Sequence, residues 1–253
     1  MSKIIWNTDR YGNACAYQQV KVPGVTTVIN EMIPNPEIDK WIEEVGQETA
    51  DRITNAANQR GTAMHAYLEH WLNEMKEVPD PGSALRKIQA KTKALLEQEG
   101  IPSQKIQEGI NLFYNFYESE YATSYTEILG TETAIYSPKL FYRGKIDWLY
   151  TQALYGLSVS DFKSSSKVIE KGSRKEIGYK YQVGAYALAL EHMLEAKGQH
   201  RKVNYSSIIS MHTKSSTVQN ISLCGDELDE YKAKFETIAR EYHIKIGQEN
   251  LLN

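Results

Sequence analysis

The sequence predicts an α/β fold in which a central mixed β-sheet is covered by helices. Two apolar-rich runs on either side of residues 151–156 alternate with period two, which is typical of an antiparallel β-hairpin. Apolar residues at three-to-four spacing before and after this hairpin indicate helices. The predicted order is an N-terminal helical region, a strand, the hairpin, a helix, two strands and a helix. This order favours a mixed sheet between helices.

A chain of 253 residues is long enough to bury a full core, so we expect residues 1–253 to form a single domain. Within it we expect residues 37–121 to be mainly helical and residues 126–223 to form the sheet core. The charged fraction of 24% and the hydrophobic fraction of 41% are ordinary for a globular protein. No apolar run approaches the length of a membrane span, so we expect no membrane partner.

Several features bear on the cellular setting. Residues 1–19 show neither the apolar region of a signal peptide nor the pattern of a transit peptide. Cys15 and Cys224 are too few for a disulfide framework or a four-cysteine metal site. We therefore expect a reducing cytoplasm, in a bacterial or phage-infected bacterial cell. The net charge of −3 argues against a passive nucleic-acid binder, but six basic residues against two acidic ones between Lys163 and Lys180 leave room for a local basic groove.

The N-terminal part is predicted to be helical after a turn at Pro23-Gly24. The residues before this turn fit a short strand or a loop, and residues 25–30 fit either a helix or an extended segment. Helical character resumes at Glu37, and Arg60-Gly61-Thr62 precedes a helix that reaches about Glu77. The apolar stripe of that helix consists of Met64, Leu68, Trp71, Leu72 and Met75.

His65 and Glu69 lie four residues apart beside that stripe, so they are neighbours on one helical face. One interpretation is a surface ion pair or a satisfied core histidine. The other is that His65 is a metal ligand and that Glu69 orients it or assists nearby. The helix alone leaves both interpretations open.

The elements that flank the hairpin follow from the same patterns. A strand over residues 126–137 contains Glu132, whose carboxylate we expect to face solvent rather than the hairpin acids. After the hairpin, Gln182 and Tyr186 share one helical face, where they either edge the apolar side or contact a phosphate. The other predicted elements are a linker (78–83), helices (84–98, 103–121, 177–197 and 227–246) and strands (203–211 and 219–223).

The hairpin spans residues 142–163 and carries the candidate chemistry. With a turn near Leu154, Asp147 lies opposite Asp161. Period two then places one set of side chains on a single face: Lys145, Asp147, Leu149, Val159, Asp161 and Lys163. The reverse face pairs Ile146 with Phe162, Trp148 with Ser160 and Tyr150 with Ser158.

Two carboxylates directly opposite each other lie about 5 Å apart and repel each other, so the predicted pair is suited to a cation. Mg²⁺ and Mn²⁺ accept sites built from one or two carboxylates and completed by water and phosphate. Lys163 shares the face, and its ammonium is suited to position a water or to offset charge on a phosphate. The alternative for an isolated Asp-x-Lys is a solvated salt bridge on an exposed strand.

Four motifs occur in order along the chain: Gly61-Thr62-x-x-His65-x-x-x-Glu69, Gly144-x-x-Asp147, Asp161-x-Lys163 and Gln182-x-x-x-Tyr186. The set resembles the RecB-type branch of the PD-(D/E)xK nuclease superfamily. Within that branch it is most similar to the mitochondrial genome maintenance exonucleases and their phage relatives. Residues 25–29 after Pro-Gly, and Ser164-Ser165 after the lysine, fit the same group. The resemblance covers residues 22–190, about two-thirds of the chain.

The resemblance implies a restriction-endonuclease-like core and assigns roles to residues. The implied ligands of Mg²⁺, or of Mn²⁺ in its place, are His65, Asp147, Asp161 and the backbone carbonyl of Phe162. The implied catalytic residues are Asp147, Asp161 and Lys163. Residues expected to support this site or to contact DNA are Glu69, Glu132, Ser164, Ser165, Lys167, Arg174, Lys175, Gln182 and Tyr186.

Two departures from the wider superfamily are visible. The cysteines that hold an iron–sulfur cluster in some RecB-like nucleases are absent, so we expect no iron–sulfur cluster. The second acid is Asp161 rather than the glutamate common elsewhere, which is normal for the RecB branch.

The predicted function is a metal-dependent exonuclease that prefers single-stranded DNA with free ends. It would act in DNA replication, recombination or repair, with proteins of those processes as candidate partners. The end preference rests on the resemblance alone. Two alternatives stay open: a structure-specific endonuclease with the same core, and a catalytically silent DNA-binding or replisome module. RNA also stays open as a substrate, because no reader of a 2′-hydroxyl group can be picked out.

Overall fold

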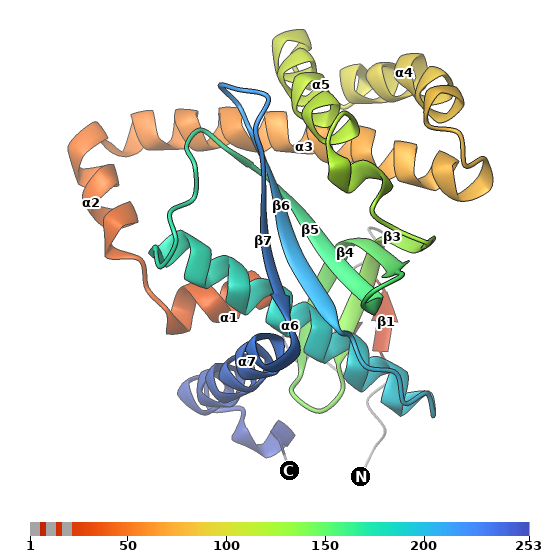
Figure 1. Cartoon of the computed structure of the whole chain (residues 1–253). Helices are drawn as coiled ribbons and strands as arrows, with labels where there is room; N and C mark the ends of the chain where they lie inside the picture. The colour runs from red at the N-terminus through yellow and green to blue at the C-terminus, as the bar shows by residue number, and fades with distance from the viewer. Residues whose placement is uncertain (1–5, 9–13, 17–21, 253) are drawn as a thin grey trace.

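A five-stranded mixed sheet forms the centre of the computed structural model, which describes residues 6–8, 14–16 and 22–252 (Figure 1). The strands, in their spatial order, are β3 (Glu127–Ser137), β4 (Tyr142–Gln152), β5 (Gly156–Ser165), β6 (Tyr205–His212) and β7 (Val218–Cys224). The β5–β6 pair is parallel and the other neighbours are antiparallel, which confirms the mixed sheet. A separate antiparallel pair joins β1 (Trp6–Thr8) and β2 (Ala14–Ala16).

Helices cover both faces of the sheet (Figure 1). The α-helices of the described ranges are α1 (Val25–Met32), α2 (Pro36–Val45), α3 (Gln47–Glu77), α4 (Pro81–Gln98), α5 (Ser103–Tyr117), α6 (Arg174–Ala196) and α7 (Gly225–Lys245), of which α2 belongs to neither core. Two short 3₁₀ turns span Glu120–Thr123 and Glu249–Leu252. Helix α6 is the crossover between the parallel strands β5 and β6, and with α1 and α7 it covers one face. Helices α3, α4 and α5 belong to the core of the other face.

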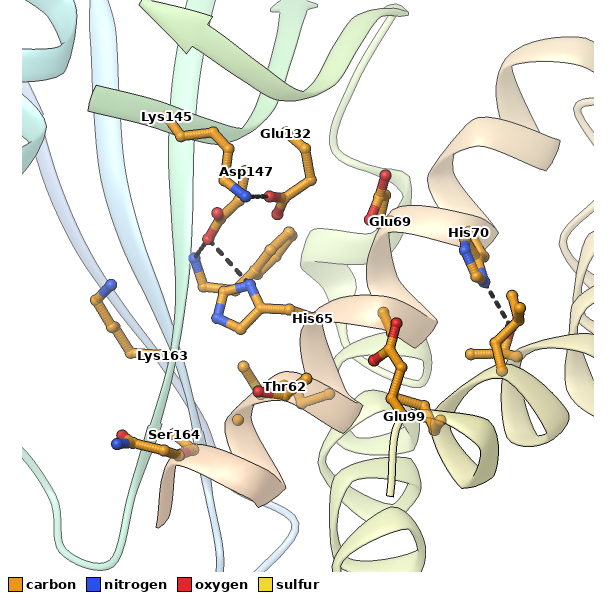
Figure 2. A pocket seen from close by; sticks show the side chains of 18 of the residues that line it. Thr62, His65, Glu69, His70, Glu99, Glu132, Lys145, Asp147, Lys163 and Ser164 are labelled. Atoms are coloured by element: carbon orange, nitrogen blue, oxygen red, sulfur yellow. Dashed lines mark hydrogen bonds and ion pairs between the residues drawn. The ribbon is translucent and has the colours of Figure 1, made fainter. Parts of the chain in front are cut away.

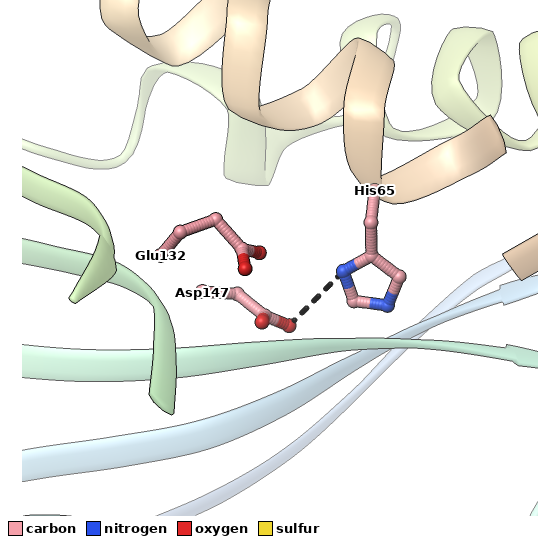
Figure 3. A group of neighbouring side chains, drawn as sticks. All are labelled: His65, Glu132 and Asp147. Atoms are coloured by element: carbon pink, nitrogen blue, oxygen red, sulfur yellow. Dashed lines mark ion pairs between the residues drawn. The ribbon is translucent and has the colours of Figure 1, made fainter. Parts of the chain in front are cut away.

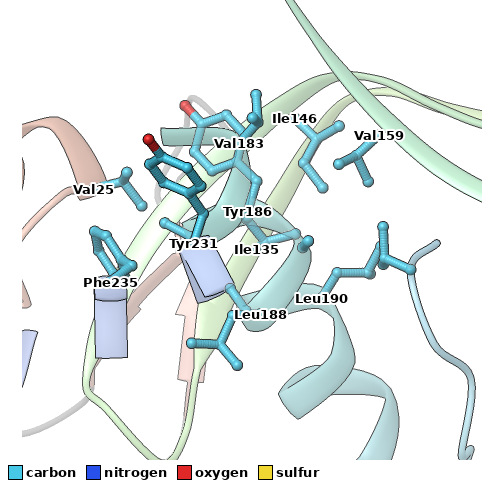
Figure 4. Packing of buried hydrophobic residues seen from close by; sticks show 14 of the residues in the cluster. Val25, Ile135, Ile146, Val159, Val183, Tyr186, Leu188, Leu190, Tyr231 and Phe235 are labelled. Atoms are coloured by element: carbon cyan, nitrogen blue, oxygen red, sulfur yellow. The ribbon is translucent and has the colours of Figure 1, made fainter. Parts of the chain in front are cut away.

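The core under α6 is closely packed because this helix presents small residues to its neighbours. Figure 4 shows Val159 of β5 and Val183 and Tyr186 of α6 in this cluster, together with Phe235 of α7. A Cβ atom added to Gly184 would lie 3.0 Å from the backbone of Tyr231, so glycine lets α6 and α7 approach each other. This packing fixes α6, which carries Gln182 and Tyr186, against the sheet.

The opposite core is dominated by aromatic rings. Trp148 of β4 and Phe162 of β5 pack against Phe116 of α5, with ring centroids 5.9 Å and 5.0 Å from that ring. Trp71 of α3 makes an edge contact with Phe116 at 6.2 Å. Such pairs add about 0.5–1.5 kcal/mol each beyond the burial of their area. They fasten α3 and α5 to the strands that carry the predicted acids.

The register of the β4–β5 hairpin is as predicted over its paired part. Leu149 pairs with Val159, Trp148 with Ser160 and Tyr150 with Ser158, and the turn contains Leu154. The paired residues end at Trp148 and Ser160, two rungs short of the predicted Ile146–Phe162 pair. Beyond that point β5 continues beside β6, while β4 continues beside β3.

The predicted faces of β4 are wrong beyond this point. Ile146 lies in the core under α6, whereas Trp148, two residues later, lies in the core under α3 and α5 with Phe162. Leu149 packs on the α6 side, so it does not share a face with Asp147, which lies next to His65 of α3. The alternation therefore breaks at Asp147, because β4 leaves the pairing with β5 there and follows β3.

In the N-terminal part, one open alternative is decided and one prediction is corrected. Residues 25–30 are helical, within α1. Helix α3 begins at Gln47 rather than near Gly61 and runs for 31 residues, so Gly61 lies inside it. Of residues 1–21, β1 and β2 are strands and the others lie outside the described residues. None of the helices within these described ranges is both long and apolar enough to cross a bilayer.

Candidate metal and catalytic site

Helix α3 runs across the end of the sheet where β5 and β6 terminate, and it carries His65 (Figure 1). Its position is set by a very close approach to α5. A Cβ atom added to Gly109 of α5 would lie 2.5 Å from Cβ of Ala63 and 2.8 Å from the backbone nitrogen of Met64. These two residues immediately precede His65, so the imidazole projects from a turn that close packing holds in place.

Glu132 and Asp147 reach the same place through an irregularity between β3 and β4. The register passes from Thr131–Trp148 to Thr133–Ile146, and Glu132 and Asp147 do not form a pair of the ladder. Glu132 has a backbone φ of 45°, in the left-handed region that a non-glycine residue rarely adopts. Its side chain is 18% exposed, so the prediction that this carboxylate faces solvent is wrong.

His65, Glu132 and Asp147 form a compact cluster. One nitrogen or oxygen atom from each residue lies within 4.8 Å of those from the other two. Figure 3 shows the three side chains pointing toward one another, with His65 Nδ1 at 3.4 Å from Asp147 Oδ2. The same Asp147 oxygen accepts a hydrogen bond of 2.7 Å from the backbone N–H of Phe162. Glu132 also forms an ion pair with Lys145.

Burial and mutual repulsion set the protonation of this cluster. Burial, followed by the repulsion of Asp161, raises the pKa of Asp147 well above its usual value, against the attraction of Lys163. Burial and the nearby Lys163 ammonium lower the pKa of His65, so its ring favours the neutral form. A neutral imidazole is the form that binds a metal. A divalent cation between these groups would lower the cost of ionising Asp147.

Asp161 and Lys163 lie beside the cluster on β5 and are paired with each other. The Lys163 ammonium forms an ion pair with Asp161, as their spacing on one strand face predicts. Gln182 of α6 donates a hydrogen bond of 3.1 Å to Asp161 Oδ1 and one of 2.8 Å to the Tyr186 hydroxyl. Burial opposes the charge of Lys163, but the attraction of Asp161 and Asp147 prevails and raises its pKa. The ion pair with Asp161 therefore favours the ammonium form of Lys163.

Tyr186 needs the glycine of the second motif. A Cβ atom added to Gly144 would lie 2.8 Å from Cε1 of the Tyr186 ring. The glycine therefore lets this ring lie flat against β4, where its hydroxyl accepts the hydrogen bond from Gln182. The Gly144, Gln182 and Tyr186 positions form one support for Asp161, and through it for Lys163.

A cavity of about 780 Å³ lies between α3, the end of α4 and the sheet, and its lining includes His65, Glu132, Asp147 and Lys163. Figure 2 shows the side chains that line it, with Lys163 and Ser164 on one side and His70 and Glu99 on another. Glu69 lies in the wall one turn after His65, and burial followed by the nearby Glu132 raises its pKa. The cavity is wide enough for a nucleotide-sized group to approach the cluster.

The donor set fits a divalent cation. Two carboxylates and one imidazole, close together and partly buried, are ligands that Mg²⁺ and Mn²⁺ accept. The structure groups Glu132, rather than the predicted ligand Asp161, with His65 and Asp147. The metal-binding roles of Asp161 and of the Phe162 carbonyl stay predictions, as does the identity of the ion.

The other predicted residues fall into two groups. Ser164 lines the cavity, and Ser165 at the end of β5 accepts a hydrogen bond of 3.0 Å from the Lys175 ammonium. Lys167 is exposed, and Arg174 donates to the carbonyl of Pro34, away from the cavity wall. Lys145 lines the cavity and is a residue that the sequence analysis placed on a strand face without giving it a role. Its position two residues before Asp147 on one strand could have indicated that Lys145 lies near the site.

Comparison with known proteins assigns the chain to a family. Residues 28–249 match the family model of the PD-(D/E)XK nuclease superfamily. A solved structure from Eubacterium rectale, described as a "putative exonuclease", is 14% identical, with a TM-score of 0.48 over 76% of this chain and 68% of that one. No curated protein sequence matches the chain. Because the family model spans most of the sequence and includes all four motifs, the chain belongs to the PD-(D/E)XK nuclease superfamily.

Proposed function

We propose that this nuclease is a Mg²⁺- or Mn²⁺-dependent DNA exonuclease that prefers single-stranded DNA with free ends. The observation that carries the metal-dependent part is the meeting of His65, Glu132 and Asp147 in one cavity, beside the Lys163–Asp161 pair. The preference for free ends and single strands is supported by the similarity of the four motifs to RecB-type exonucleases. The same similarity supports a role in replication, recombination or repair, and the low cysteine content supports a reducing, cytoplasmic setting.

The residues divide the work of phosphodiester hydrolysis among them. A bound divalent cation supplies positive charge at the scissile phosphate and lowers the pKa of water. His65, Glu132 and Asp147 hold that charge at one end of the cavity. Lys163, kept protonated by Asp161 and Asp147, places an ammonium where negative charge develops on the phosphate. Gln182 keeps Asp161 in the orientation that this ammonium requires.

The test is digestion of end-labelled DNA, single-stranded and double-stranded, linear and circular, with Mg²⁺, Mn²⁺ or EDTA. We expect degradation of linear single strands, sparing of circular single strands, and complete loss of cleavage in EDTA. Lys163→Ala and Asp161→Ala should each abolish cleavage, because the loss of several kcal/mol of stabilisation lowers the rate by more than about 100-fold.

Each alternative has its own signature in the same assay. Cutting of circular single strands identifies an endonuclease with this core. DNA binding without cleavage under any metal identifies a silent binding module. A Lys163→Ala or Asp161→Ala protein that keeps more than about a tenth of the activity would remove these residues from the chemistry.

A further inference from the structure

A second cavity, of about 540 Å³, lies between α3, α5 and the turn that joins β6 to β7. Its wall combines three cationic side chains with one acid and a buried histidine. These are Arg60 of α3, Lys105 and Glu108 of α5, and His212 and Lys214 from the end of β6 and the turn after it. None of the roles proposed above uses any of these residues.

The second cavity adjoins the first along consecutive residues. Gly61 and Thr62 line the catalytic cavity, and Arg60, the residue before them, lines the second one. On the sheet side, Ser164 lines the catalytic cavity and its neighbour Ser165 pairs with His212 of the second. Figure 1 shows the β6–β7 turn reaching past α3 beside α5. A strand that leaves the catalytic cavity across the ends of β5 and β6 therefore reaches the second cavity.

The charge of this cavity is positive, although the chain carries a net charge of −3. Lys105 donates to both oxygens of Glu108, at 2.7 Å and 2.8 Å, and Arg60 Nη1 lies 3.6 Å from the same carboxylate. The hydrogen bond from Lys105 lowers the pKa of Glu108, so this acid stays ionised. With Lys214, three cations face one carboxylate, which leaves an excess of two positive charges.

Two residues of this wall each have a buried, unpaired side-chain nitrogen. Arg60 Nε and His212 Nε2 are shielded from solvent and have no hydrogen-bond partner within the described part of the chain. An unsatisfied buried polar group costs about 1–3 kcal/mol, and Arg60 Nε always carries a hydrogen, so a turn of this side chain toward an anion in the cavity would satisfy it. A guanidinium with several N–H groups suits the oxygens of a phosphate in particular.

The wall that holds these groups is firmly built. Asn115 of α5 donates from its amide to the carbonyls of His212, at 3.2 Å, and Ser215, at 3.0 Å. The N–H of Thr213 donates to the carbonyl of Ser165 at 2.9 Å. These bonds fasten the turn to both α5 and β5, so His212 and Lys214 keep a fixed relation to the catalytic strand.

We propose that this cavity, with Arg60, His212 and Lys214 in its wall, binds a phosphate group of the nucleic-acid strand at a nucleotide beyond the scissile bond. The proposal rests on the nuclease function proposed above and adds to it a fixed anchor for the strand. Such an anchor sets the path of the backbone between the two cavities. It acts without regard to base sequence, because it contacts only the phosphate.

The test measures the binding of labelled oligothymidylates of increasing length in EDTA, so that no cleavage intervenes. For the wild type we expect a step in affinity at the length that first reaches the second cavity. Arg60→Gln and Lys214→Gln should each remove that step, weaken binding of longer strands by about tenfold, and reduce the slope of log Kd against log salt by about 0.7. The matched control is Lys234→Gln on α7, an exposed lysine paired with an exposed glutamate on the other face. It should change neither quantity.

Competition by inorganic phosphate, compared with chloride at equal ionic strength, distinguishes a site for free anions from a site for a phosphate of the strand. Competition that disappears in both variants together with the length step supports the proposal. The proposal would be overturned if inorganic phosphate binding depended on Arg60 but oligonucleotide affinity did not. Wild-type oligonucleotide affinity in both variants would also overturn it. Thermal melting checks folding, and exposed Lys214 provides the second variant if Arg60→Gln does not fold. A chain that binds DNA but never cuts it refutes the nuclease, not the cavity, so the two failures are distinct.

Discussion

Glu132 shows how one backbone conformation decides the composition of the site. A φ of 45° costs a non-glycine residue free energy, about 1–3 kcal/mol for such strained positions, and strain of this kind gathers at functional sites. Here it turns the carboxylate from the solvent side of β3 toward His65 and Asp147. Strand alternation does not predict this backbone conformation, so it gave the wrong side for Glu132. His65, Asp147 and Lys163 could be named as candidates because they belong to the sequence motifs.

If Glu132 is a metal ligand, Glu132→Gln should lower cleavage by at least about 100-fold, because an amide in place of the carboxylate weakens the hold on a divalent cation. Cleavage rates over a Mg²⁺ titration, compared at a concentration that half-saturates the wild type, measure the loss. Its matched control is Glu230→Gln on α7, where an exposed glutamate likewise pairs with a lysine. Near wild-type rates in both proteins would remove Glu132 from the metal site.

At the scale of the element, α3 shows what periodicity does and does not reveal. The stripe from Met64 to Met75 correctly predicted the end of the helix, because those residues are buried against α5 and the sheet. The first part, from Gln47 to about Arg60, is largely exposed, so it carries no apolar stripe to read. Helix boundaries are predictable where packing imposes a pattern and unpredictable where solvent allows any residue.

The contact between α3 and α5 predicts a distant effect on the site. Gly109→Ala should lower the free energy of unfolding by about 1–3 kcal/mol, because its Cβ meets the backbone at Met64. It should also weaken metal binding, since the displaced turn carries His65. Urea unfolding and a Mn²⁺ titration measure the two effects.

Gly178→Ala in α6 is the matched control for that change. An added Cβ there meets nothing within 4 Å, so the substitution should stabilise the helix by up to about 1 kcal/mol and leave metal affinity unchanged. Unchanged stability and metal affinity in Gly109→Ala would show that α3 can shift without loss of folding free energy. The contact with α5 would then not fix the position of His65.

At the scale of the whole molecule, binding of a divalent cation at the Glu132–Asp147 cluster should raise the free energy of unfolding. A ligand at 100 times its Kd stabilises the folded state by about 2.7 kcal/mol. For a chain of this size that corresponds to a rise in Tm of about 5–10 °C. We expect Mg²⁺ to produce such a rise over NaCl of equal ionic strength, followed by scanning calorimetry. An equal rise in Asp147→Asn would place the bound ion elsewhere.

The overall architecture was the most predictable level. The order of strands and helices along the chain and the hairpin register up to Trp148 and Ser160 follow from alternation and from turn residues, whereas the spatial order of the strands was not predicted. The side on which Ile146 lies did not follow, because it depends on β4 losing β5 as a neighbour partway along its length while it stays paired with β3. The point at which β4 and β5 separate is set by tertiary packing, and local sequence periodicity does not contain it.

The opening between β4 and β5 has a practical consequence for anyone who wishes to capture an uncut complex. Where the ladder ends, the Asp147 carboxylate accepts the Phe162 N–H that a main-chain carbonyl would otherwise accept. Asp147→Ala would leave the buried Phe162 N–H without an acceptor, at a cost of about 1–3 kcal/mol, whereas Asp147→Asn keeps a side-chain oxygen that can accept this hydrogen bond. An inactive form meant for crystals with intact DNA is therefore better made with asparagine at this position than with alanine.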